Sequence, residues 1–220
     1  MIDDWMVTIP KGKIFLRDNR RNEIWLEIIE SFLLSKYLIT QDIYEKIMKE
    51  NPSTFVSADN PVEGVTWHKA IEFCNLLSSA SGLQRCYETD SLNKVVNLVP
   101  GASGYRLPTD AEWEFSCLAN SSDVQYGPIN KIAWFDENSN NSTQAVGKKI
   151  PNQFGLFDML GNVWEWCWDV YDPEVYGSYR VFRGGGWADS SRGCLATNRR
   201  RSHPTYAIDD LGFRVAKAIL

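Results

Sequence analysis

The chain has 220 residues, of which 44% are hydrophobic, and a formal net charge of −5. This length suits a single domain over residues 1–220, and the acidity argues against a nucleic-acid partner. No apolar run approaches the ~20 residues that span a bilayer, and the opening MIDDWMVTIPKGK lacks the pattern of a signal peptide. We therefore expect a cytoplasmic protein with no membrane partner.

The cysteines are odd in number and widely spaced, and no CxxC occurs. They are Cys74, Cys86, Cys117, Cys167 and Cys194. This pattern is typical of reduced thiols rather than of a disulfide framework. A zinc site is not expected, because only His68 and His203 could join the thiols as nitrogen ligands.

The first elements are strands and a short helix. MVTIPKGKIFL and IWLEIIESFLLSKYLIT are rich in β-branched and aromatic residues, which predicts strands over 6–16 and 24–40. TQDIYEKIMKENP then predicts a short helix: Thr40 is its candidate N-cap, Asp42 falls in the first turn, and Pro52 lies beyond the end.

Two further helices follow. Thr66 is the candidate cap of the helix in VTWHKAIEFCNLLSSASG, with Gly82 after its end. The predicted buried face of that helix consists of Ala70, Phe73, Cys74 and Leu77. In LPTDAEWEFSCLA, Thr109 and Glu112 form a capping-box pattern. The predicted apolar stripe of this last helix is Ala111, Phe115 and Leu118.

After residue 120, turn residues separate short aromatic segments, so the chain is predicted to be α+β with many loops. In GNVWEWCWD, an extended conformation over 163–168 places three indoles on one face and Glu165 with Cys167 on the other. Gly184, Gly185 and Gly186 lack the lysine and the following helix of a phosphate loop. They are expected to permit a sharp turn and close packing beside Trp187.

Several segments together resemble the sulfatase-modifying-factor family, which contains the formylglycine-generating enzymes. They occur in the order MVTIPKGKIFL, YLITQDIYEKIM, NPVEGVTWHKAIEFCNLLS, GYRLPTDAEWEFSCLA, PNQFGLFDMLGNVWEWCWD, YRVFRGGGW and DLGFRVAKA. The resemblance covers nearly the whole chain. It implies a variant of the C-type-lectin fold, with few helices, short twisted sheets and long loops.

The resemblance also implies a structural calcium ion in the segment GLFDMLGNVWEW. The ligands carried over by position are the Asp158 side chain, the carbonyls of Gly161 and Val163, and the Glu165 carboxylate. Calcium accepts six to eight oxygen ligands, backbone carbonyls included. The alternative is that Glu165 is a buried, hydrogen-bonded carboxylate or the partner of an arginine.

The catalytic metals of the family are not expected. In aerobic formylglycine-generating enzymes two cysteines in a C-x4-C spacing hold copper, and the matching positions here are Ser191 and Ala196. Cys194 alone cannot form the two-thiolate site that Cu(I) favours. Relatives with non-heme iron use a histidine-rich set, and this chain has only two histidines. His68 is interpreted as a helix-start residue, and His203 stays a candidate for function.

The segment from Arg180 to Arg214 carries seven arginines and three aspartates, a charge of +4 in an acidic chain. Arg199 matches a family arginine and is expected to form a structural ion pair. Arg200 and Arg201 either form a solvated face or bind an anionic group, for which an arginine offers a bidentate fork.

Two functions remain open. The first is a non-catalytic or altered family member that binds a protein, peptide or small-molecule ligand through the lectin-like segment 187–206. The candidate ligand-binding residues are Trp187, Arg192, Cys194, Asn198, Arg200, His203 and Tyr206. The second is a metal- and oxygen-dependent oxidoreductase that modifies a peptide residue or a small molecule. The missing cysteine pair favours the first.

Overall fold

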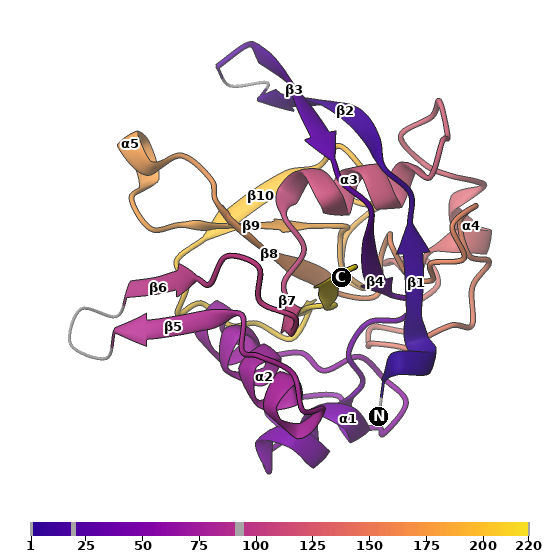
Figure 1. Cartoon of the computed structure of the whole chain (residues 1–220). Helices are drawn as coiled ribbons and strands as arrows, with labels where there is room; N and C mark the ends of the chain where they lie inside the picture. The colour runs from indigo at the N-terminus through magenta and orange to yellow at the C-terminus, as the bar shows by residue number, and fades with distance from the viewer. Residues whose placement is uncertain (1, 19–20, 91–94, 220) are drawn as a thin grey trace.

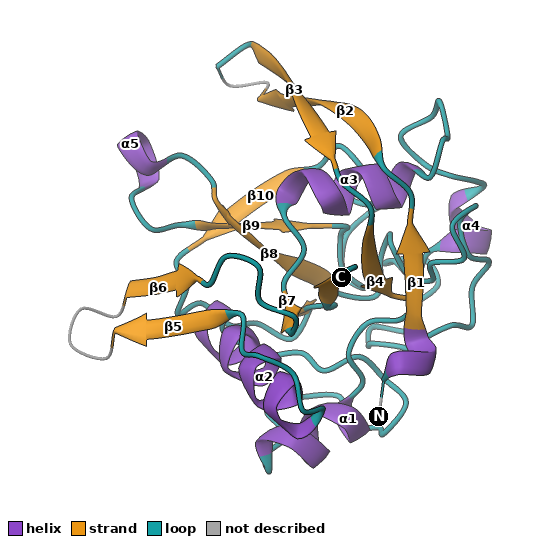
Figure 2. Ribbon diagram, viewed as in Figure 1, coloured by secondary structure: helices purple, strands orange, loops and turns teal. Residues whose placement is uncertain are grey.

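The computed structural model describes residues 2–18, 21–90 and 95–219. Within them, two four-stranded sheets and two hairpins are joined by short helices and long loops (Figures 1 and 2). The helices are η1 (Asp3–Trp5), α1 (Gln41–Met48), α2 (Trp67–Ala80), α3 (Asp110–Leu118), α4 (Ile129–Ile132) and α5 (Pro173–Tyr176). This arrangement confirms the α+β class. No helix among the described residues is long and apolar enough to cross a membrane.

The first sheet joins the two ends of the chain. Its strands, in spatial order, are β1 (Met6–Ile9), β4 (Phe32–Ser35), β12 (Ala216–Ala218) and β7 (Tyr105–Arg106). The second sheet has the order β10 (Arg199–Ser202), β9 (Arg180–Arg183), β8 (Trp164–Val170) and β11 (Leu211–Gly212). Only the β8–β11 pair in these two sheets is parallel. Glu165 in β8 and Arg200 in β10, two of the candidate site residues, lie in the second sheet.

The predicted N-terminal strands are each divided in two. One hairpin forms from β2 (Gly12–Asp18) and β3 (Glu23–Ile29), whereas β1 and β4 pair in the first sheet. Pro10 separates β1 from β2, because proline has no backbone N–H for a ladder. A second hairpin consists of β5 (Tyr87–Asp90) and β6 (Val95–Leu98).

All three predicted helices are confirmed, with one correction to the faces. The four residues of the predicted stripe of α2 are fully buried, and Thr66 accepts a hydrogen bond from the Lys69 N–H at 3.2 Å. The capping box of Thr109 and Glu112 is present in α3. Thr40 occupies the N-cap position of α1 without a side-chain capping bond.

The stripe predicted for α3 was wrong in part. Phe115 and Leu118 are only partly buried, whereas Trp113 and Cys117 are fully buried. The reason is that α3 lies between the β2–β3 hairpin and the second sheet, so it buries more than one face (Figure 1). A single apolar stripe cannot describe a helix with neighbours on two sides.

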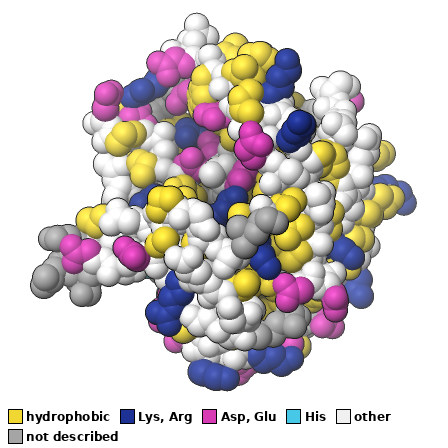
Figure 3. Space-filling model, viewed as in Figure 1, with side chains coloured by type: hydrophobic (Ala, Val, Ile, Leu, Met, Phe, Trp, Pro, Cys, Tyr) yellow, Lys and Arg dark blue, Asp and Glu magenta, His cyan; other side chains and the backbone are white. Residues whose placement is uncertain are grey.

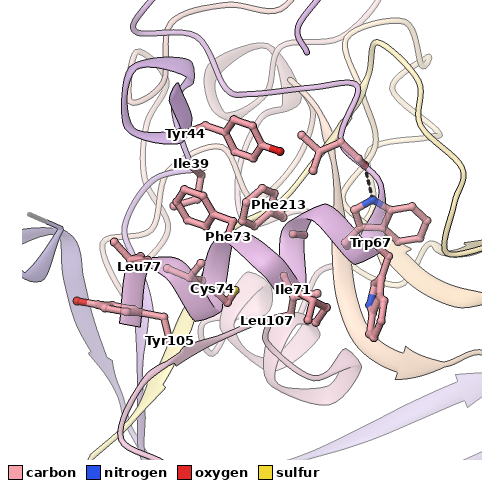
Figure 4. Packing of buried hydrophobic residues seen from close by; sticks show 14 of the residues in the cluster. Ile39, Tyr44, Trp67, Ile71, Phe73, Cys74, Leu77, Tyr105, Leu107 and Phe213 are labelled. Carbon is pink, nitrogen blue, oxygen red and sulfur yellow. Dashed lines mark hydrogen bonds between the residues drawn. The ribbon is translucent and has the colours of Figure 1, made fainter. Parts of the chain in front are cut away.

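Aromatic side chains from distant parts of the chain meet in the core (Figure 4). Phe73 of α2 stacks on Tyr44 of α1, with ring centroids 5.5 Å apart, and meets Phe213 edge-on at 5.2 Å. Trp164 and Trp166 of β8 belong to this same cluster, and Cys167 points to the second cluster beneath α3. The extended, alternating conformation predicted for this strand is confirmed, and both of its faces are buried at Glu165 and Trp166.

The glycine run after β9 forms the expected tight turn. Gly184 and Gly185 have φ of 102° and 85°, where a β-carbon is strained. A β-carbon on Gly185 would also lie 2.8 Å from Cys194 Sγ. The turn thus brings the loop that holds Cys194 against the end of β9.

Candidate functional site

The carboxylate of Glu165, in the middle of the tryptophan-rich strand, pairs with Arg214. Arg214 Nε lies 2.6 Å from Glu165 Oε2 and Nη2 lies 2.9 Å from Oε1, and both side chains are completely buried. Arg214 also donates to the carbonyls of Ser35 and Phe157 at 3.0 Å each. Burial raises the pKa of Glu165, and Arg214 opposes that rise. This pair joins β8 to the connection between β11 and β12 and explains the carboxylate among the indoles.

Asp158 lies near this pair and has an unsatisfied oxygen. Its Oδ2 accepts a hydrogen bond from the Gly147 N–H at 2.7 Å, while its Oδ1 is buried without a hydrogen-bond partner. Burial raises the pKa of Asp158 to about 6. Oδ1 is a suitable oxygen ligand for a cation. Both oxygens of Glu165, by contrast, already accept hydrogen bonds from Arg214. The ligand set that the resemblance implies therefore fits only if Glu165 contacts Arg214 and the calcium ion at the same time.

A second buried ionic network connects α3 to the second sheet. Arg183 bonds to Asp110 and to Glu114, and Arg199 bonds to the other oxygen of Asp110 at 2.6 Å. Burial alone would raise the pKa of Asp110, but the two arginines outweigh it and the pKa is lowered. Arg199 is thus a structural ion-pair residue, as the sequence predicted.

The positions that match the copper-binding thiols carry a hydroxyl and a methyl group instead of thiols. Ser191 is partly exposed, Ala196 is buried, and Cys194 between them is completely buried. Burial raises the pKa of Cys194 to about 12. All five cysteines are free and buried. Cys194 was predicted to contact ligand, but its side chain lies in the core beneath the surface, so it is corrected to a packing residue.

One side of β10 presents Arg200. Its side chain is 55% exposed, and its guanidinium lies over the Trp164 ring at 4.5 Å. It also lies 3.3 Å from Asp189 Oδ1, whose other oxygen accepts a hydrogen bond from Trp164 Nε1. Trp187 is partly exposed and meets Phe55 edge-on at 5.2 Å. This side of β10 therefore combines the guanidinium of Arg200, which its neighbours hold in place, with the partly exposed indole ring of Trp187.

The other side of β10 holds tyrosines. The Arg201 guanidinium lies 3.8 Å from the ring centre of Tyr176, and the exposed His203 ring meets Tyr179 at 6.0 Å. His203 Nδ1 lies 2.7 Å from Thr205 Oγ1. Sequence analysis did not identify this tyrosine cluster, because Tyr176 at the end of α5 and Tyr179 in the loop before β9 reach β10 only in the folded structure.

The remaining candidate residues differ in their exposure to solvent and in their hydrogen bonding. Arg192 is exposed, and Tyr206 is 41% exposed. Asn198 is half-buried, and its amide donates to the carbonyls of Arg192 and Gly193 at 2.9 and 2.8 Å, so it closes its own loop. The predicted residues thus lie on β10 and in the loops before and after it rather than in one pocket.

A hollow of about 480 Å³ brings the two histidines together. It is lined by His68, Val95, Val96, Ser178, Arg180, His203, Pro204 and Thr205. Arg180 lies over the ring of Trp67 at 3.9 Å, and burial lowers its pKa to about 10. His68 is the second residue of α2, as predicted. Its place beside this hollow was not predicted, because the approach of α2 to the loop after β10 is a tertiary feature.

These observations define an α+β protein whose tryptophan-rich strand and arginine-rich segment are fixed by buried ion pairs. Residues 3–219 match the family described as the sulfatase-modifying factor enzyme 1-like domain. The chain belongs to this family.

Relatives within the family carry different names. "Chaperone protein LppX" of Paenibacillus barcinonensis is 35% identical, and the match covers 74% of this chain and 71% of that protein. "Inactive C-alpha-formylglycine-generating enzyme 2" of mouse is 31% identical, covering 52% and 44%. The match spans only 23% of the "Serine/threonine-protein kinase pkn1" of Chlamydia pneumoniae. Except for LppX, these matches therefore span less than half of each relative.

Solved structures confirm the fold of the family. "Treponema denticola variable protein 1" superposes with a TM-score of 0.87 at 31% identity, covering 97% of this chain and 95% of that one. "Crystal Structure of CarF" gives a TM-score of 0.79 at 25% identity, covering 97% and 98%.

Proposed function

We propose that this chain is a non-catalytic member of the formylglycine-generating-enzyme-like family that binds a protein, peptide or small-molecule ligand. The binding face runs from Trp187 to Tyr206. The observation that carries the proposal is Arg200, which is held over Trp164 and beside Asp189 yet leaves 55% of its side chain exposed. A preorganised arginine on an aromatic platform is typical of interface anchors.

The chemistry of the segment also disfavours the oxidoreductase alternative. A copper site needs two thiolates, and this segment offers a hydroxyl, a methyl group and one buried thiol with a raised pKa. The described residues contain no group of three or more His, Cys, Asp or Glu side chains that could hold a metal ion. The family itself includes a relative named as an inactive enzyme and one named as a chaperone.

The lectin-like character of the fold belongs to the same proposal. The resemblance to lectin-like relatives implies that the segment 187–206 displays variable residues. Here the segment is supported from below by Asp110, Arg183 and Arg199, which are buried and paired. Side chains such as Arg200, His203 and Tyr206 can therefore change without disturbing the core.

The face is tested by capture of partners from lysate, identified by mass spectrometry. Replacing Arg200 and His203 with alanine should weaken capture about thirtyfold, since truncating an anchor costs ~2 kcal/mol or more. The matched control replaces Glu45 and Lys46 of α1, where the Lys46 side chain is 70% exposed. Equal capture by the face variant and the wild-type protein, with loss in the α1 variant, would place the binding face elsewhere.

We also propose one structural calcium ion, held by Asp158, the carbonyls of Gly161 and Val163, and Glu165. The buried, unpartnered Oδ1 of Asp158 supports it. An ion that binds only the folded state stabilises that state by mass action, so chelation should lower the melting temperature. An unchanged melting temperature in excess chelator, together with no calcium in elemental analysis, would leave Arg214 as the sole partner of Glu165.

A further inference from the structure

The β2–β3 hairpin has one face that no other part of the described structure covers. Its register pairs Lys13 with Ile28, Phe15 with Leu26, and Arg17 with Ile24. Side chains alternate between the two faces of a strand, so these six residues share one side, which we name the outer hairpin face. The opposite face is buried at Ile14, Leu16 and Ile29.

The outer hairpin face is unusually apolar for an exposed surface. Its four large hydrophobic side chains are exposed by 61% at Phe15, 58% at Ile24, 47% at Leu26 and 64% at Ile28. They are contiguous, because each lies opposite or diagonal to another across the ladder. Hydrophobic side chains gather over β2 and β3 at the top of the molecule in Figure 3. A contiguous patch of this kind marks an interaction surface rather than scattered apolar residues.

The charge of this face is opposite in sign to that of the whole chain. Lys13 and Arg17 are both exposed on it, and no acidic residue shares it. The acidic residues of the hairpin, Asp18, Glu23 and Glu27, lie on the other side by alternation. The face thus carries a charge of +2 on a protein whose formal net charge is −5.

We propose that the outer hairpin face docks onto an anionic lipid surface. Its aliphatic and aromatic side chains enter the interfacial region, and Lys13 and Arg17 pair with the lipid phosphates. The hairpin extends from the body next to α3, so the face can reach a flat surface (Figure 1). The expectation of no membrane partner rested on the lack of a segment that could span a bilayer. Peripheral docking does not need such a segment.

Charge and shape favour a lipid surface over the other occupants. Two copies that met face to face would bring four cationic side chains together with no acidic partner on either face. A protein partner inserts anchor side chains into pockets. The hollow beside this hairpin is lined by residues of its inner face, such as Leu16, Trp25 and Glu27. The outer face, by contrast, is formed by alternate side chains of two paired strands.

The test is sedimentation of the full chain with vesicles of phosphatidylcholine alone and of phosphatidylcholine with phosphatidylglycerol. We expect binding to the anionic vesicles that weakens with added salt. Replacing Lys13 and Arg17 with alanine should weaken it roughly 25-fold, about fivefold for each basic residue near the surface. Replacing Phe15 and Leu26 with serine should weaken it at least about tenfold.

Matched controls replace exposed residues away from the hairpin. Val56 and Ile150, exposed by 78% and 56%, become serine, and Lys46 and Lys148 become alanine. Binding to anionic vesicles that is absent, or that the hairpin and control variants reduce equally, would overturn the proposal. So would a dimer in solution that only the hairpin variants dissociate, because it would assign the face to a second copy. If the variant with serine at positions 15 and 26 has a lowered melting temperature, vesicle binding by the Lys13 and Arg17 variant tests the proposal.

Discussion

The buried pair of Glu165 and Arg214 makes the sharpest prediction about stability. Replacing Arg214 with methionine keeps apolar packing but leaves the Glu165 carboxylate without its partner at a site that is 0% exposed. It also leaves the carbonyls of Ser35 and Phe157 without a donor. Breaking a buried ion pair by removing one partner costs roughly 3–5 kcal/mol. For a chain of this size the melting temperature should fall by roughly 6–20 °C.

Urea unfolding followed by tryptophan fluorescence measures this cost, with chelator present so that no cation compensates the carboxylate. Glu165→Gln should lower the unfolding free energy by less than Arg214→Met does, because glutamine keeps the shape of the side chain and one acceptor oxygen. The double variant should recover part of the loss, since no unpaired charge remains. A cost below ~1 kcal/mol for Arg214→Met, or a double variant as unstable as the sum of the singles, would refute the pairing as a main stabilising contact.

Three further outcomes are expected from the buried groups of this structure. Burial raises the pKa of Glu63 to about 7, so the folded state keeps a proton that the unfolded chain releases at lower pH. The unfolding free energy should therefore fall as the pH rises from about 5 to 7. Urea titrations at several pH values should show a smaller fall for the Glu63→Gln variant. The five buried thiols should not react with Ellman's reagent until the protein unfolds, and rapid native labelling of Cys194 would contradict its burial. Thr109→Ala should cost about 1 kcal/mol in the same urea assay through loss of the α3 cap, and no change would mean that Glu112 alone holds that end.

Local features of the fold were predictable from the sequence. Helix caps and stripes depend on residues within one or two turns, which is why Thr66, the capping box of Thr109 and the buried face of α2 were all identified. The alternation of Trp164 and Glu165 followed from strand geometry in the same way. The division at Pro10 also had a local signal, the missing N–H, which the strand prediction did not use.

Features that depend on distant segments could not be predicted. Arg214 is 49 residues from Glu165 in the chain, so the sequence left the partner of that carboxylate open. The burial of Cys194 depends on the glycine turn that packs against it, whereas its place in the segment 187–206 made it a candidate ligand-binding residue. The placement of His68 and His203 around one hollow likewise requires the position of α2. In each case a tertiary contact overrides the local pattern.

The claim that this family member is not a formylglycine generator is tested most directly on a peptide. Copper-loaded protein is incubated with oxygen and a cysteine-containing sulfatase peptide, and the product is analysed by mass spectrometry. With Ser191 and Ala196 at the thiol positions, the peptide should keep its cysteine. Loss of the thiol mass with appearance of an aldehyde product would contradict this account.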